Sequence, residues 1–319
     1  MSLTVSVIIC CYTEDRLDDI REAVASVQRQ SRPPEEILLV VDNNRALYQT
    51  LSRTGLGSGV RIILHEGLRG SAAARNAGAL ATTSDVVAFI DDDAVADRRW
   101  LERVLNALAN GATVAGGKAV PVWPGHRPSW FPEELDWLVG GTYRGYRNGR
   151  GVVRNVHIHN MALLRSAFLA VGMLETDAGG GGGMVATASR GGEEAELCLR
   201  LAHEFPSAKI VYEPGAKIWH KVGAQQASLR GLVRRSYGEG RYKAWVRSVL
   251  PIDSGRALST EAAYLRYLVL WAIPSRLLRF WQPAALAQAA AIVACIAAVG
   301  TGYLVGKGQF RRISAARRT

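Results

Sequence analysis

The sequence predicts an α/β fold with a mostly parallel central sheet, followed by a C-terminal helical segment associated with a membrane. Three observations predict it: apolar strands alternate with helices in the first hundred residues, polar residues follow those strands, and a long uncharged apolar run lies near the C-terminus. With 319 residues, 48% hydrophobic and 21% charged, the chain is neither disordered nor a small disulfide-stapled domain. Its four cysteines show no C-x-x-C spacing, so neither a zinc site nor a disulfide framework is indicated.

Short β-branched apolar runs predict buried parallel strands, and the segments between them have helical periodicity. Such alternation is typical of right-handed βαβ units, and ligands of these sheets bind beyond the carboxyl ends of the strands. The strands are expected at 4–10, 36–41, 60–64 and 85–90, and the helices at 17–30, 71–81, near Trp100 and at 193–203. The stretch 123–151, rich in Pro, Trp, Gly and Arg, reads as a structured loop region.

The positive charge of the chain is concentrated at its C-terminal end. Residues 1–223 carry 24 Lys and Arg against 25 Asp and Glu, whereas residues 224–319 carry 15 against 3. We therefore expect a near-neutral catalytic domain at 1–223 and a basic membrane-anchoring region at 224–319. A basic region binds either nucleic acid or an anionic membrane surface. Because no nucleic-acid motif is present and the charges flank an apolar run, the membrane is the expected partner.

The apolar run 284–306 is long enough to cross a bilayer, although a buried helix of a soluble domain is the alternative. The preceding stretch 264–281 mixes Leu, Trp and Tyr with Arg and suits a helix in the membrane interface, with Pro274 and Pro283 expected to break it. Basic residues flank the run on both sides, so a single span and a re-entrant hairpin both stay open. No N-terminal signal peptide is expected, since a strand follows Met1 almost directly.

Three consecutive carboxylates, Asp91, Asp92 and Asp93, follow the strand expected at 85–90. They would repel one another unless a cation or strong donors compensate their charge. Asp91 and Asp93 can converge because residues two apart share a strand face. Oxygen ligands of this kind favour Mg²⁺ or Mn²⁺ together with substrate phosphates. The alternative is an acidic turn that caps the helix near Trp100.

Four other segments carry side chains or backbone groups that could bind a ligand or take part in catalysis. The stretch 67–78 could cradle a phosphate at a helix N-terminus, although it is neither a P-loop nor a G-x-G-x-x-G motif. Glu193, Glu194 and Glu196 lie in the first turn of a helix. There they either stabilise the helix through its dipole or supply a general base. His220 becomes a credible ligand only near a carboxylate-bound ion. The five glycines at 179–183 indicate an active-site lid or a disordered loop.

Taken in order, these segments resemble family 2 glycosyltransferases, which are inverting, metal-dependent enzymes with the GT-A nucleotide-sugar fold. The resemblance runs from Ser6 to about Val222. It rests on the stretches SVIICCYTED at 6–15, VVDNN at 40–44, R-N-x-G at 75–78, FIDDD at 89–93, N-M-A at 160–162 and E-E-x-E-L at 193–197. The last departs from the family's E-D-x-E-L, because a glutamate replaces the aspartate.

The resemblance implies a role for individual side chains. Asp93 and His220 would hold the metal. Glu194 would be the catalytic base, with Glu193 as a possible substitute because of the departure at this motif. The residues implied to bind the nucleotide-sugar are Thr13, Glu14, Asp42, Arg75, Asn76 and Asp91. The residues expected on the acceptor side are His159, Asn160, Trp130 and Arg235.

Segments 130–145 and 235–244 are similar to membrane-associated enzymes that extend polyprenyl-phosphate-linked sugars. This similarity implies a nucleotide-sugar donor, most simply a UDP-sugar, and a lipid-linked acceptor at the cell membrane, with the catalytic domain on the cytoplasmic face. Two other enzymes stay open: a glycosyltransferase that acts on a non-lipid cell-surface glycan, and a nucleotidyltransferase. A catalytically dead membrane scaffold is a further alternative.

Overall fold

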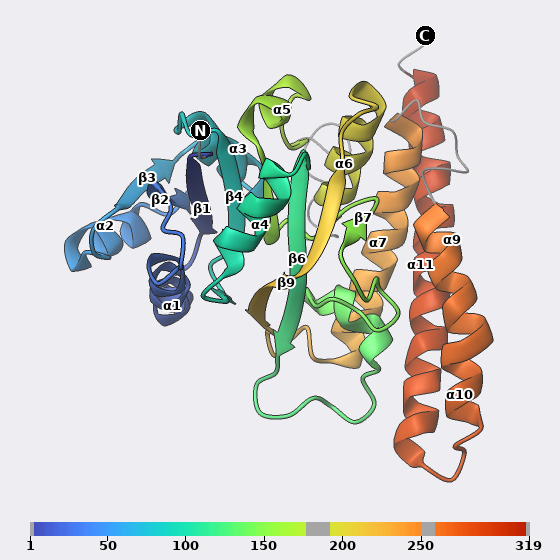
Figure 1. Cartoon of the computed structure of the whole chain (residues 1–319). Helices are drawn as coiled ribbons and strands as arrows, with labels where there is room; N and C mark the ends of the chain where they lie inside the picture. The colour runs from blue at the N-terminus through green and yellow to red at the C-terminus, as the bar shows by residue number, and fades with distance from the viewer. Residues whose placement is uncertain (1–2, 177–191, 250–258, 317–319) are drawn as a thin grey trace. The chain divides into compact units, whose positions relative to one another are not determined.

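The computed structural model describes residues 3–176, 192–249 and 259–316, so the expected lid at 179–183 lies outside the described residues. The chain divides into two compact units (Figure 1). The first comprises the chain up to Val120, Arg147–Thr176 and Glu193–Lys221. Pro121–Tyr146 groups with the chain from Val222 onward in the second unit, although the sequence placed this segment in the first domain.

Four parallel strands form one half of the sheet in the first unit. They pair in the order β3-β2-β1-β4, and each agrees with an expected strand to within one residue at either end. Their bounds are β1 Val5–Cys11, β2 Glu36–Asp42, β3 Val60–His65 and β4 Val86–Asp91. Nearly every residue of β1, β2 and β4 is buried, which explains why these strands are continuous Val- and Ile-rich runs.

Helices connect and cover these strands (Figure 1). They are α1 Leu17–Gln28, α2 Arg45–Thr54, α3 Ser71–Leu80 and α4 Trp100–Ala109, preceded by the 3₁₀ turn η1 Glu14–Arg16. The sequence did not predict α2, which buries only Leu47 and Leu51 and is capped by the Asn44 side chain. Gly78 lets α3 approach β1 closely, since a Cβ there would lie 2.7 Å from the Ile8 side chain.

Later strands extend the sheet on the other side of β4, and the described sheet is mixed. β8 pairs antiparallel with β4 and with β6, and β9 pairs antiparallel with β5 and β7. Their bounds are β5 Ala94–Ala96, β6 Val114–Val122, β7 Gly151–Val152, β8 Asn160–Leu164 and β9 Ile210–Lys221. Two helices complete the unit, α5 Arg165–Ala170 and α6 Glu193–Glu204.

The second unit is helical among its described residues. Its elements are η2 Glu133–Val139, α7 Leu229–Val249, α9 Ser259–Tyr267, η3 Leu268–Ala272, α10 Ile273–Leu277 and α11 Pro283–Ala316. An apolar core joins them, with Leu232, Leu268 and Ile292 buried. α7 and α11 run side by side (Figure 1) and touch through glycines: a Cβ on Gly240 or on Gly302 would lie 2.0 Å from a backbone oxygen of the other helix.

Pro274 does not break the helical segment, contrary to expectation. The preceding turn η3 is a π-helix, and the Ile273 amide donates to the carbonyl of Leu268. This wider turn accommodates the proline at the start of α10, so the chain stays helical until the turn before α11. Pro283 does coincide with a break, because α11 begins there. Within α11, Pro283–Phe310 is long and apolar enough to cross a membrane, with a mean hydropathy of 2.0.

Candidate active site

The acidic cluster lies at the turn between β4 and β5, and an arginine compensates part of its charge. Arg16 Nη1 lies 2.9 Å from Asp92 Oδ1 and 2.9 Å from Asp93 Oδ2. Burial and the neighbouring Asp93 charge raise the pKa of the Asp92 carboxyl to about 7. The cluster does not cap α4. That helix begins at Trp100, whose amide donates to the carbonyl of Asp97, a residue beyond the cluster. Sequence reasoning did not identify Arg16, which no motif singles out.

Arg75 connects the first carboxylate of the cluster to the start of α6. Its Nη2 lies 2.7 Å from Asp91 Oδ1 and its Nη1 lies 2.6 Å from Glu193 Oε1. The guanidinium is buried and comes from α3. Burial acts to raise the pKa of Asp91, but Arg75 and His220 outweigh it and hold that pKa far below its usual range. These neighbours therefore favour the charged form of Asp91.

Three histidine rings gather beside this carboxylate. His159 lies 4.7 Å from His220 and 5.1 Å from His157, measured between ring centroids. His220 Nε2 lies 3.6 Å from Asp91 Oδ2 and 3.3 Å from Asp93 Oδ1. Register brings His220 here, since β9 pairs it with Ala94 directly after the acidic turn.

The ligand atoms of Asp91, His159 and His220 lie within 4.8 Å of one another, which is close enough to surround one cation. Burial holds the pKa of His159 well below its usual value. Neutral imidazole is the form that binds metals, so the residues fit a divalent ion. The sequence predicted Asp93 with His220 as ligands and His159 on the acceptor side. In the structure one oxygen of Asp93 pairs with Arg16, while the other lies 3.3 Å from His220 Nε2, so its function as a ligand stays a prediction. His159 joins the candidate ligands.

The three glutamates that open α6 have different surroundings. Glu193 is held by Arg75, and the buried Glu196 pairs with Arg200 at 2.7 Å. Glu194 lies beside the histidines, with Oε1 3.8 Å from His157 Nδ1. His157 was not predicted, although its H-x-H spacing with His159 was a usable signal. Of the three carboxylates, Glu194 is the one that faces the histidine cluster.

Asp42, Thr13 and Glu14 lie where β2 and β1 end. Asp42 Oδ2 accepts from the Gly70 amide at 2.9 Å, which joins the end of β2 to the loop before α3. Thr13 caps η1 by accepting from the Asp15 amide, and the exposed Glu14 accepts from the Thr50 hydroxyl at 3.3 Å. These positions follow the carboxyl ends of parallel strands, as expected for a ligand site. Their contact with a nucleotide stays a prediction.

Asn76 has a structural function, and its contact with the nucleotide stays a prediction. It is buried, its Nδ2 donates to the Leu174 carbonyl at 2.8 Å, and its Oδ1 accepts from the Leu174 amide at 3.1 Å. Both polar atoms of the amide are thus occupied by one backbone residue. Asn76 fixes the chain after α5 against α3, whereas Arg75 beside it reaches the site.

Asn160 likewise has a structural function. Its side chain is fully buried, and Oδ1 accepts from the Trp100 indole at 2.8 Å. Nδ2 donates to the carbonyls of Ala216 at 3.0 Å and Lys118 at 3.2 Å. Its polar atoms tie α4, β6 and β9 together, and the expected acceptor contact of this residue stays a prediction.

We expect Asn160→Ala to lower the free energy of unfolding by about 1–3 kcal/mol, since it leaves the buried Trp100 indole and the Ala216 carbonyl without this partner. Chemical denaturation followed by tryptophan fluorescence measures the change. Asn148→Ala, at an exposed loop position, is the control and should leave stability unchanged. An Asn160 variant of normal stability but weakened acceptor binding would contradict this assignment.

Trp130 and Arg235 belong to the second unit and are described within it. The Trp130 ring packs 5.5 Å from Phe131, and Arg235 is half-buried on α7. Their contact with an acceptor stays a prediction.

A mixed sheet with parallel N-terminal strands, an acidic turn after β4 and a histidine at the end of β9 is the GT-A-like arrangement of nucleotide-sugar glycosyltransferases. Residues 6–172 match the family described as glycosyl transferase family 2. The chain is 33% identical over 311 residues to the glucosyl-dolichyl phosphate glucuronosyltransferase of Haloferax volcanii, which covers 95% of this chain and 96% of that protein. The chain belongs to glycosyl transferase family 2 and is a glycosyltransferase.

Solved structures show the same fold at low sequence identity. One is a mannosyltransferase from Pyrobaculum calidifontis in complex with GDP-Man and Mn²⁺, with a TM-score of 0.61 and 14% identity over 95% of this chain and 88% of that one. Another is GalNAc-T7 with UDP, GalNAc and Mn²⁺, with a TM-score of 0.55 and 15% identity over 82% of this chain and 54% of that one. These likenesses confirm the predicted fold class.

Proposed function

We propose that this glycosyltransferase moves a sugar from a nucleotide-sugar, of the UDP type, to a polyprenyl-phosphate-linked acceptor at a membrane, with inversion and with a divalent cation. One observation carries the chemistry: Asp91, Arg75, His159, His220 and Glu194 come from five separate segments and converge. The lipid acceptor is supported by the relative that is similar over nearly its whole length and is named for a dolichyl phosphate substrate.

Asp91, His159 and His220 would hold the cation, with Asp93 beside them. A donor set with two imidazoles suits Mn²⁺ better than Mg²⁺, which prefers oxygen ligands and water. When bound, the cation would neutralise the charge that develops on the departing nucleoside diphosphate. Arg75 holds Asp91 in its charged form and in place, so this ligand is oriented by the protein itself.

Glu194 would accept the proton of the acceptor hydroxyl as its oxygen attacks the anomeric carbon. Attack on the face opposite the leaving nucleotide inverts the configuration. Glu193 is less suited to this role, because Arg75 Nη1 lies 2.6 Å from its Oε1 and occupies that oxygen. The ion pair of Glu196 with Arg200 occupies that side chain in the same way. Glu194 is therefore our choice of base, as the sequence predicted.

Membrane association would come from the second unit. Its helix α11 carries the apolar segment Pro283–Phe310, one third of whose apolar window is buried in the protein. The glycine contacts with α7 account for part of that burial. We infer that the enzyme works at the cell membrane with its catalytic unit on the cytoplasmic face, where nucleotide-sugars are made.

The proposal is tested by incubating the purified chain with UDP-, GDP- and dTDP-sugars, with and without a glycosylated polyprenyl phosphate. We expect release of nucleoside diphosphate that depends on the lipid, and a lipid product heavier by one sugar in mass spectrometry. Release of pyrophosphate would indicate a nucleotidyltransferase instead. Transfer to a soluble glycan without any lipid would favour a cell-surface glycan acceptor, and donor hydrolysis alone would already exclude a dead scaffold.

A further inference from the structure

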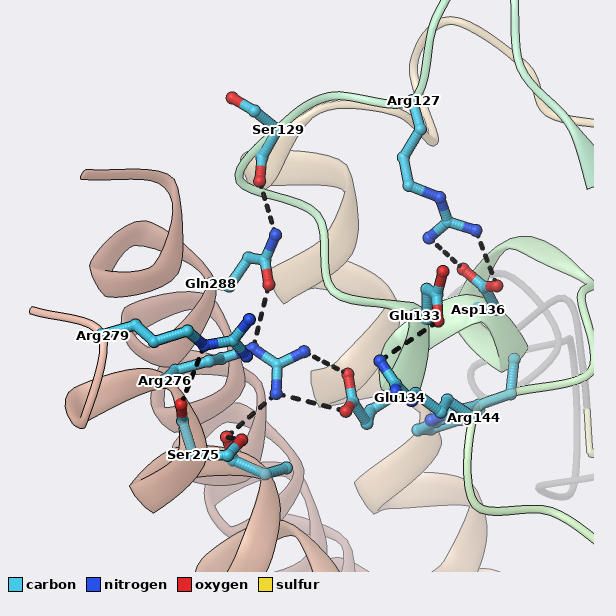
Figure 2. Close-up of polar contacts among 12 residues, drawn as sticks. Arg127, Ser129, Glu133, Glu134, Asp136, Arg144, Ser275, Arg276, Arg279 and Gln288 are labelled. Atoms are coloured by element: carbon cyan, nitrogen blue, oxygen red, sulfur yellow. Dashed lines mark hydrogen bonds and ion pairs between the residues drawn. The ribbon is translucent and has the colours of Figure 1, made fainter. Parts of the chain in front are cut away.

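A pocket of about 280 Å³ lies within the second unit, between the residues that follow η2 and one face of the helices α9 to α10. Three arginines, a glutamate and two aromatic residues line most of it (Figure 2 shows its polar contacts): Arg144, Arg276, Arg279, Glu134, Tyr267 and Trp271. None of the carboxylates or histidines of the candidate active site lines this pocket. It is thus a second site, which the proposed chemistry does not use.

The floor of the pocket is rigid and electrically balanced. Arg276 is buried, and its guanidinium contacts the Glu134 carboxylate at 2.5 and 3.2 Å. Its Nε donates to Gln288 Oε1 at 2.9 Å, and the Gln288 amide donates in turn to the Ser129 carbonyl (Figure 2). The ion pair between Arg276 and Glu134 is buried, and Gln288 holds its arginine in place. The pair therefore fixes the position of the pocket walls, but its two charges cancel and leave none for a ligand.

The rim of the pocket carries the uncompensated charge. Arg144 Nη1 lies 3.6 Å from Glu133, so a rim carboxylate offsets it in part. Arg279 donates its Nε to the Ser275 carbonyl at 3.1 Å, and among the described residues no carboxylate pairs with it. One hydrogen bond therefore orients the guanidinium of Arg279, and its positive charge stays available to an anionic ligand. The pocket and its rim together hold an excess of one positive charge.

The surface around the rim is apolar. Trp271 is 71% exposed and Leu278 is 74% exposed. Leu270, Phe280 and Trp281 are also largely exposed. A patch of large apolar and aromatic side chains beside arginines is typical of a segment that lies in the membrane interface. An amphiphile could place a charged group at the rim and its chains over this patch.

We propose that this pocket binds the phosphodiester of an anionic membrane phospholipid and so docks the segment 259–281 on the membrane surface. The inference rests on the proposed function, which places the enzyme at a membrane. A phosphodiester carries one negative charge, which equals the excess at the rim, whereas a phosphate monoester carries up to two. Arg279 and Arg144 donate to the phosphate oxygens, and the acyl chains cover Trp271 and its apolar neighbours.

The test uses the full chain in a neutral detergent and measures binding of dioctanoyl phosphatidylglycerol by microscale thermophoresis. We expect Arg279→Gln to weaken binding about tenfold or more, because the variant loses a charge-assisted hydrogen bond to the phosphate. Arg144→Gln should have a smaller effect, since Glu133 already offsets this charge. Arg45→Gln is the matched control, an exposed arginine of the first unit that pairs with Glu66.

Equal binding of phosphatidylglycerol by the wild type and Arg279→Gln overturns the proposal, as does an equal loss in Arg45→Gln. The proposed acceptor, a glycosylated polyprenyl phosphate, is also a phosphodiester, so tighter binding of a glycosylated farnesyl phosphate than of phosphatidylglycerol would assign the pocket to the acceptor lipid. Equal binding of inorganic phosphate would assign it to a free anion. Dioctanoyl phosphatidylcholine should bind weakly. Sugar transfer is measured on the same wild-type sample: lipid binding without any transfer refutes the proposed function and leaves the pocket assignment standing.

Discussion

Replacing Glu194 by glutamine is expected to lower kcat by about 10²–10⁴-fold while the affinity for the nucleotide-sugar donor stays unchanged. The amide keeps the shape of the side chain but cannot accept the proton of the attacking hydroxyl. Steady-state kinetics gives the loss of kcat, and calorimetric titration with the nucleoside diphosphate gives the donor affinity. Glu194 faces the histidine cluster, with its carboxylate 3.8 Å from His157, so the change is close to the reacting groups.

Two variants on the same helix sharpen this test. Glu204→Gln, at an exposed position near the end of α6, should behave as the wild type. Glu193→Gln removes the carboxylate that pairs with Arg75, and we expect it to weaken donor binding more than it lowers kcat. If Glu193→Gln lost kcat and Glu194→Gln did not, the two glutamates would have to exchange their assigned roles.

Removal of the divalent cation should abolish sugar transfer, and Mn²⁺ should restore it more effectively than Mg²⁺. The His159→Ala variant is the decisive one, because the structure groups His159 with Asp91 and His220. We expect it to weaken Mn²⁺ binding by at least about tenfold, as even outer partners of a metal site contribute that much. Electron paramagnetic resonance of free Mn²⁺ measures this without any turnover.

His203→Ala, an exposed histidine in the last turn of α6, is the control for this experiment. A His159→Ala variant with normal Mn²⁺ affinity and a raised KM for the acceptor would return this residue to the acceptor side, where the sequence first placed it. Full transfer activity in excess chelator would remove the cation from the proposed mechanism altogether.

Much of the secondary structure of the first unit can be predicted from the local pattern of apolar and polar residues. Buried strands such as β1 and β4 are runs of apolar β-branched residues, and no distant contact is needed to recognise them. The position of Asp91 at the end of β4 follows from the same pattern, since the strand ends where the carboxylates begin. Helix α2 escaped prediction because only two of its residues are buried, which leaves a weak apolar stripe.

The sequence by itself determined the fold class, the family and the place of the acidic turn, because each depends on order and spacing along the chain. Only the tertiary structure decided how the side chains are used. It pairs Asp93 with Arg16 and Glu193 with Arg75, and it brings His159 to Asp91. It also binds the Asn76 amide to the backbone of Leu174, and the Asn160 amide to the Trp100 indole and two backbone carbonyls. The physical reason is that a charge or an amide takes the partner nearest in space, and residues 16 and 93, or 75 and 193, become neighbours only when the sheet has formed.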